Sequence, residues 1–172
     1  MKLILISIIL TFFSLFNFAN ANNIVFVDMD KILSDSKPGS NILKQLNILR
    51  ENNVNDFDKK TKLLKEKEEE IIKQKNILSP KDFQIKVVDL KNEVNDYNKY
   101  RENKIKNYNK LKSENTNKLL GLISPILSNY TKNNSILMIL QKKNIILGKV
   151  ELDITKTIIE LVNKNIKNFK IK

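Results

Sequence analysis

Few side chains in this sequence are of a kind that performs catalysis. The chain contains no histidine and no cysteine, which excludes zinc sites built on these ligands, thiol chemistry and mechanisms with a histidine base. Asp28 and Asp30 lie on one side of the end of a predicted strand, where two carboxylates could hold a metal ion. Without further ligands, a turn or capping role is favoured. Gly39 and Gly148 belong to no phosphate-binding pattern. The sequence therefore predicts no catalytic residue, no cofactor and no metal site.

The net charge of +12 calls for an anionic partner or a role in solubility. Residues 59–81 hold eight lysines against four glutamates. This pattern fits attraction to acidic proteins or to an anionic membrane surface, and it equally fits a solvated helix face with charge pairs four residues apart. Both interpretations stay open, and the abundance of lysine and asparagine could itself reflect biased genome composition. Nucleic acid is an unexpected partner, because the chain has no recognised nucleic-acid-binding motif and is predicted to be exported.

The first 21 residues have the three regions of a secretory signal peptide. Lys2 is followed by an apolar run from Leu3 to Phe18, and Ala19 and Ala21 occupy the −3 and −1 positions of a cleavage site. We expect cleavage after Ala21 and an exported, extracytoplasmic mature chain that begins at Asn22. An uncleaved anchor is the alternative, although the run falls short of the ~20 residues that span a bilayer.

Two long helices are predicted in the middle of the chain. Between Asn41 and Leu78 there is no Gly or Pro. Of six positions spaced by seven residues, Arg50 is charged and the other five are apolar, namely Leu43, Phe57, Leu64, Ile71 and Leu78. Ser79 and Pro80 are a typical N-cap and first residue of a second helix, which we expect to run to about Ser124, with Pro125 as a kink or restart. Arg101 and Lys104 weaken its apolar stripe. An antiparallel hairpin over residues 41–128 follows.

The remaining segments predict a small β body formed by residues 22–40 and 129–172. A buried strand at Ile24–Met29 precedes a turn at Ser36–Ser40, and Ser135–Leu140 and Ile145–Gly148 read as a β-hairpin. Asp153 caps a final helix. Three short strands make a small core with open edges, which favours oligomerisation. The candidate β-body and oligomerisation residues are Ile24, Val25, Phe26, Val27, Ile136, Leu137, Met138, Ile139, Ile145, Ile146 and Leu147.

The order of these elements resembles the Skp (OmpH-like) family of periplasmic chaperones for outer-membrane proteins. The resemblance rests on residues 24–33 at the mature start, the charged stretch 65–70, residues 78–83 at the predicted tip and residues 152–155 before the last helix. It implies an α+β homotrimer in which strands of three subunits complete one β body and the hairpins project as tentacles. It also implies an ATP-independent holdase that keeps unfolded outer-membrane β-barrel proteins in the cavity between the tentacles.

The same resemblance suggests where clients and membranes would be contacted. Family members engage anionic lipid or lipopolysaccharide, but no compact basic lipopolysaccharide motif is present here, so that site is not carried over. The candidate client-contacting residues lie on the outer hairpin, where the apolar ones equally fit the seam between two helices. They are Phe57, Leu64, Ile71, Ile77, Leu78, Phe83, Lys73, Lys75 and Lys81.

A structural or adaptor coiled-coil protein of the cell envelope is the alternative function. It would share the long helices and would bind one folded partner, but it gives no reason for the β elements. An enzyme is not expected, because no nucleophile–base pair or cofactor loop is present.

Overall fold

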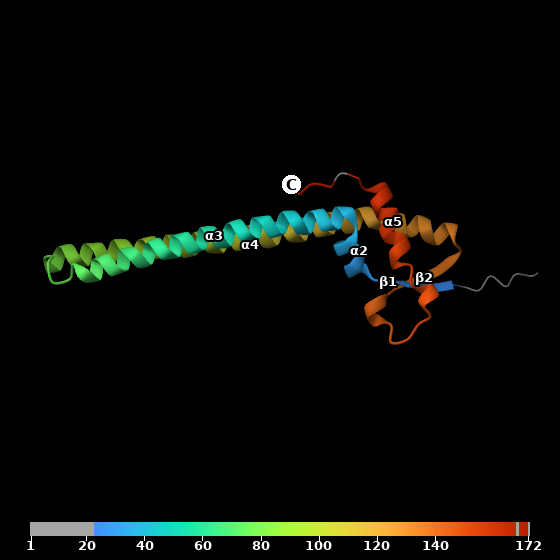
Figure 1. Ribbon diagram of the computed structural model, residues 1–172, viewed down its shortest axis with the longest axis horizontal. Coiled ribbons are helices and arrows are strands. Elements are labelled where there is room, and N and C mark those ends of the chain that lie inside the picture. The colour runs from blue at the N-terminus through green and yellow to red at the C-terminus, as the bar shows by residue number, and fades with distance from the viewer. Residues whose placement is uncertain (1–22, 168, 172) are drawn as a thin grey trace, which may run out of the picture.

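The computed structural model describes residues 23–167 and 169–171, so the predicted signal peptide, with Ala19 and Ala21, lies outside the described residues. The elements are β1 (Asn23–Val27), α2 (Met29–Asp35), α3 (Lys37–Lys73), α4 (Pro80–Asn133), β2 (Ile136–Gln141), two 3-10 turns (Lys142–Asn144 and Val150–Leu152) and α5 (Thr155–Asn165). α3 and α4 lie side by side as a long hairpin that projects from a small body of β1, β2, α2 and α5 (Figure 1). The predicted α+β fold with a helical hairpin and a C-terminal helix is confirmed.

The turn predicted at Ser36–Ser40 is wrong, because these residues begin α3. The Ser36 side chain accepts a hydrogen bond from the Gly39 amide at 3.3 Å, and Pro38 occupies the first turn. The same Ser36 ends α2 through its amide, which donates to the Ile32 carbonyl. A Cβ at Gly39 would lie 1.8 Å from the Leu33 carbonyl oxygen, so only glycine fits this crossing of α2 and α3.

The start of α4 agrees with the prediction, but its end does not. The Ser79 side chain accepts from the Asp82 amide at 3.2 Å, as expected of an N-cap. The helix then continues through Pro125 without a break and ends at Asn133. There the Asn134 amide and side chain both donate to the Tyr130 carbonyl, at 3.2 and 2.8 Å. The hairpin helices therefore extend beyond the predicted limits of 41 and 128 at both ends.

The predicted β-hairpin of Ser135–Leu140 and Ile145–Gly148 does not form. β2 pairs instead with β1 in a parallel two-stranded sheet, in which Val25 faces Ile139 and Phe26 faces Leu140. Residues 145–148 form no strand. Parallel pairing needs a long crossover, and α2, α3 and α4 supply it. Three predicted strands thus become two, and the third lies in a loop that follows β2.

The core of the molecule lies where the base of the hairpin meets α2, α5 and the sheet. Its buried side chains are Val25, Val27, Ile32, Ile42, Leu46, Leu119, Ile123, Ile154, Ile158, Val162 and Phe169. The predicted capping role of Asp28 is confirmed: its side chain accepts from the Lys31 amide at 3.0 Å and so caps α2. Its amide donates to Thr155 Oγ1 at 2.9 Å, which joins the end of β1 to the start of α5.

Asp153 stands one residue farther from α5 than predicted. The N-cap position is Ile154, whose side chain makes no capping bond, while Asp153 Oδ1 accepts from the Thr155 amide at 3.0 Å. The Ile154 amide donates to the Phe26 carbonyl at 3.0 Å, so this segment also continues the pairing of β1. Within residues 23–167 and 169–171, no helix has both the length and the apolar character needed to cross a bilayer.

Candidate functional site

Two tyrosines of α4 join the middle of the hairpin to α3. The Tyr97 hydroxyl donates to the Phe57 carbonyl at 3.2 Å and lies 2.9 Å from Thr61 Oγ1. The Tyr100 hydroxyl donates to Asp56 Oδ2 at 2.8 Å, and its ring meets that of Phe57 edge to face, with 6.5 Å between centroids. Both rings are therefore fixed against α3 with their polar ends satisfied.

Cations pack on these aromatic rings. Lys60 Nζ and Lys104 Nζ lie 4.9 and 5.4 Å from the centroid of Tyr100, and Arg101 Cζ lies 5.8 Å from that of Phe57. Arg101 and Lys104 interrupt the apolar stripe of α4, and they contribute cation–π contacts there. Sequence analysis missed Tyr100, although the step of three from Tyr97 fits the same helical spacing.

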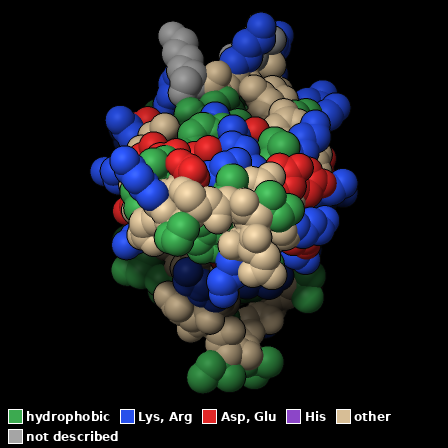
Figure 2. Space-filling view, turned by 90° about the vertical axis from the view of Figure 1, so that its left-hand side faces the viewer, with side chains coloured by type: hydrophobic (Ala, Val, Ile, Leu, Met, Phe, Trp, Pro, Cys, Tyr) green, Lys and Arg blue, Asp and Glu red, His purple; other side chains and the backbone are tan. Residues whose placement is uncertain are grey.

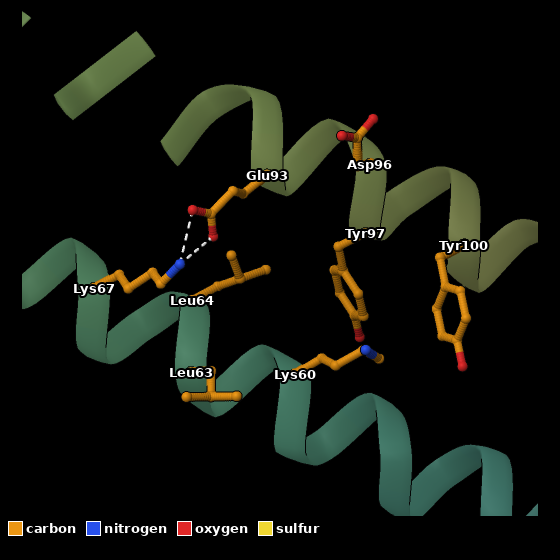
Figure 3. Close-up of a pocket in the computed structure, with 8 residues that line it drawn as sticks. All are labelled: Lys60, Leu63, Leu64, Lys67, Glu93, Asp96, Tyr97 and Tyr100. Carbon is orange, nitrogen blue, oxygen red and sulfur yellow. Dashed lines mark hydrogen bonds and ion pairs between the residues drawn. The ribbon is translucent and has the colours of Figure 1, made fainter. Parts of the chain in front are cut away.

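An open groove lies between these tyrosines and an ion pair farther toward the tip (Figure 3). Its volume is about 560 Å³, and its lining residues are Lys60, Leu63, Leu64, Lys67, Glu93, Asp96, Tyr97 and Tyr100. Lys67 Nζ contacts both carboxylate oxygens of Glu93, at 2.7 and 2.6 Å, across the two helices. Leu64 and Tyr97 point into the gap between the helices, as Figure 3 shows.

A second groove of about 500 Å³ shares Leu64 and Tyr97 with the first and is otherwise lined by different residues, among them Val87, Leu90 and Val94. The seam between α3 and α4 is therefore incompletely closed along the outer hairpin. Apolar side chains there are held in place by the helices and still reach the solvent. Such a surface can contact other apolar groups without any rearrangement of the backbone.

Comparison with known proteins decides the family. The model of the family described as "Outer membrane protein (OmpH-like)" matches residues 23–162. The chain belongs to the OmpH-like family. Among solved structures, it is similar to a "putative outer membrane chaperone (OmpH-like)" from Caulobacter crescentus, with a TM-score of 0.78 and 10% sequence identity over 86% of this chain and 88% of that one. None of the curated proteins is similar enough to count as a match. The family resemblance read from the sequence is thus confirmed.

The predicted client-contacting residues of the hairpin fall into three groups by side-chain type and exposure. Five apolar ones are half-buried: Leu78 in the turn after α3, which ends at Lys73 and not at Leu78 as predicted, and on the two helices Phe57, Leu64, Ile71 and Phe83. Ile77 near the tip is 81% exposed, and Lys73, Lys75 and Lys81 are exposed around it. Viewed from the tip, lysines and arginines surround smaller apolar patches (Figure 2). The nine residues share no single pocket among the grooves described above, and their role in client binding stays a prediction.

The predicted body residues are divided between the core and the surface. Val25, Phe26 and Val27 are buried in the same chain, and Ile136, Ile139 and Ile145 are half-buried. The others are exposed, namely Ile24 (44%), Leu137 (64%), Met138 (49%), Ile146 (103%) and Leu147 (92%). The loop after β2 lies below the rest of the body in Figure 1, and Figure 2 shows apolar side chains at the same height, at the bottom of the molecule.

An ion pair closes that loop at its two ends. Lys142 Nζ lies 2.6 Å from Asp153 Oδ2 and 5.9 Å from the centroid of Phe26. Burial raises the pKa of the Asp153 carboxyl, but hydrogen bonds from Lys142 and Thr155 outweigh burial and hold the pKa below its usual value. The hydrogen bond to Asp153 raises the pKa of Lys142. A Cβ at Gly148 would lie 2.8 Å from the Phe26 ring, so glycine lets the loop pass close to β1.

Proposed function

We propose that this OmpH-like protein is a periplasmic holdase chaperone, which binds unfolded outer-membrane β-barrel proteins without ATP and prevents their aggregation. The observation that carries the proposal is the outer hairpin, whose apolar seam stays open to solvent while the buried core lies in the body and the base of the hairpin. The Caulobacter protein of similar fold bears the description of an outer membrane chaperone. Family and fold agree with the same function.

The hairpin has the physical properties that such a chaperone needs. An unfolded barrel strand exposes apolar side chains and unpaired backbone groups that aggregate. The 37 residues of α3 reach about 55 Å at ~1.5 Å per residue, so one hairpin offers many small contact sites. Each apolar site is shallow, so each contact is weak. Many weak contacts hold a client and still release it when the client folds, with no need for ATP.

We further propose that the protein is a homotrimer joined through the body. Within residues 23–167 and 169–171 the sheet has two strands, and a two-stranded sheet is marginally stable alone. Ile146 and Leu147 are almost fully exposed beside it, where an exposed apolar loop marks an interaction site. Association of three copies would bury this loop, let residues 145–148 complete the shared sheet, and arrange three hairpins around one cavity.

A specific feature of the tip favours a second partner, an anionic membrane surface. Ile77 is 81% exposed, and the exposed lysines Lys73, Lys75 and Lys81 lie within four residues of it in the sequence. Basic groups around an apolar side chain bind anionic headgroups and insert the apolar group between them. Vesicles that contain phosphatidylglycerol should bind the protein, neutral phosphatidylcholine vesicles should not, and Ile77→Ser should weaken the binding.

The experiment that tests the holdase proposal is aggregation of a denatured outer-membrane β-barrel protein after dilution into buffer. Residues 22–172, in several-fold excess over the client and without nucleotide, should suppress the light scattering. Unchanged scattering, together with tight binding to one folded envelope protein, would instead indicate the adaptor function. Light scattering of the protein alone should give the mass of three chains, and a folded monomer would contradict the trimer.

A further inference from the structure

We propose that the groove between Leu63 and the two tyrosines of α4 is a site for aromatic and branched aliphatic side chains of an extended polypeptide. The inference rests on the proposed holdase function and names the part of the client that one hairpin holds. Its basis is a combination of apolar side chains, fixed aromatic rings and balanced charge in the lining of this groove.

The groove is a built site, because its walls are fixed. Tyr97 and Tyr100 have both hydroxyls engaged by groups of α3. The Lys67–Glu93 ion pair closes the end toward the tip. Leu63 and Leu64 lie next to each other on α3, and Leu63 is 56% exposed. The volume of about 560 Å³ is within the range of ~300–1,000 Å³ that is usual for ligand pockets.

The charge of the groove argues against an ionic occupant. Its lining contains two lysines and two carboxylates, so the formal charges cancel, although the whole chain carries +12. Lys60 and Lys104 already lie over the Tyr100 ring, which leaves that ring a poor site for a client cation. An anion meets Glu93 and Asp96. A neutral apolar side chain is neither repelled by these carboxylates nor in competition with the two lysines for the Tyr100 ring.

Aromatic side chains fit the groove best among neutral ones. Ring edges carry partial positive charge and pack favourably on the faces and edges of tyrosine rings. Outer-membrane β-strands carry girdles of aromatic residues at both membrane interfaces and alternate apolar with polar positions. Every second side chain of such a strand can therefore enter a groove while the neighbours face water. The groove thus selects the segments that most need protection before they insert.

A fluorescence experiment tests the site directly, since the chain has no tryptophan. The probe is a neutral ten-residue peptide of serine and threonine with tryptophan at two alternate positions, in 150 mM salt. A peptide with glutamates in place of both tryptophans, followed through an attached dye, is the ionic control. We expect the tryptophan emission to shift to shorter wavelength when the wild-type protein binds.

The variant Leu63→Gln removes the apolar floor without emptying a core, and it should bind the tryptophan peptide roughly tenfold more weakly. Leu63→Met should bind as the wild type does. Ile85→Gln is the matched control, because Ile85 is 48% exposed on the same hairpin and does not line this groove. Binding of the glutamate peptide should be the same for all variants. Circular dichroism verifies that each variant keeps its helices.

Two readouts separate this inference from the proposed function. If wild-type protein suppresses aggregation but Leu63→Gln binds the tryptophan peptide as tightly as the wild type, the groove assignment is overturned and the holdase stands. If the peptide binds at the groove but aggregation is unchanged, the holdase proposal fails and the groove remains a peptide site. Equal losses for Leu63→Gln and Ile85→Gln would also overturn the groove assignment.

Discussion

The body and the outer hairpin use the same kinds of side chain in opposite ways. In the body and the base of the hairpin beside it, Ile32, Ile123, Ile158 and Val162 are 0% exposed and belong to one core cluster. Along the hairpin, Leu63 is 56% and Val54 48% exposed, although each lines a groove formed by both helices. A pair of helices buries only a narrow stripe, whereas a junction of helices and a sheet surrounds its residues. The body therefore provides stability, and the hairpin keeps apolar surface available.

The largest expected difference between the two regions is in the cost of deleting a side chain. Ile158→Ala removes a fully buried side chain of α5 and should lower the free energy of unfolding by about 2–5 kcal/mol. Ile72→Ala, at a position that is 61% exposed on α3, should cost less than about 1 kcal/mol. Urea denaturation followed by circular dichroism measures both. Equal losses of unfolding free energy for the two variants would mean that the hairpin also has a fully buried core.

Two glycine-to-alanine substitutions compare a crowded position with an open one, because each adds only a Cβ atom. A Cβ at Gly39 would overlap the Leu33 carbonyl, while a Cβ at Gly121 meets nothing within 4 Å. Gly39→Ala should therefore destabilise the protein by about 1–3 kcal/mol. Gly121→Ala should stabilise it by up to about 1 kcal/mol, because alanine favours the helix. The order of the two melting temperatures checks this, and a stabilising Gly39→Ala would disprove the crossing of α2 and α3.

A smaller effect should stay inside the hairpin. Tyr100→Phe removes the hydrogen bond to Asp56, with an expected cost of about 0.5–1.5 kcal/mol. Hydrogen exchange should become faster in the facing parts of α3 and α4 and remain unchanged in the body. Asp56→Asn keeps an acceptor oxygen and should exchange as the wild type does. Faster exchange throughout the body would contradict the separation of the two regions.

The smallest effect belongs to the loop of the body. Although burial alone would raise the pKa of Asp153, hydrogen bonds hold it below the unfolded value of 3.8. The folded chain then binds fewer protons, so this carboxylate adds stability above that pH and loses it as the pH falls through the folded pKa. Wild type should lose up to about 1 kcal/mol more than Asp153→Asn between pH 5 and pH 2. Parallel stability curves would contradict the role of the Lys142–Asp153 pair.

The local signals in the sequence predicted most of the fold. Ser79 and Pro80 marked a helix start that the structure reproduces, and the heptad spacing predicted the hairpin. Ser36–Ser40 misled because serine, proline and glycine mark turns as well as helix starts. Ile145–Leu147 read as a strand because its composition fits one, but β2 takes β1 as its partner. Pairing between distant strands leaves no local signal.

The site was predictable only in part. Spacing by seven placed Leu64 and Phe57 on the seam, where the structure has them half-buried. It could not show that the seam stays open, since this depends on how closely α3 and α4 pack. Nor did it reveal that Lys60 lies over Tyr100, because these two residues are forty positions apart in the sequence. Lys104 follows Tyr100 by four positions, so that contact does fit the helical spacing.

The most direct test of the account is site-specific photo-crosslinking at one position in each region. A photoreactive residue replaces Leu63 on the hairpin or Ile146 on the body loop, which are 56% and 103% exposed. With an unfolded outer-membrane β-barrel protein present, position 63 should crosslink to the client, and position 146 should crosslink to another copy of this chain. Client crosslinks from position 146 and none from position 63 would contradict the account, in which the hairpin binds clients and the body joins the subunits.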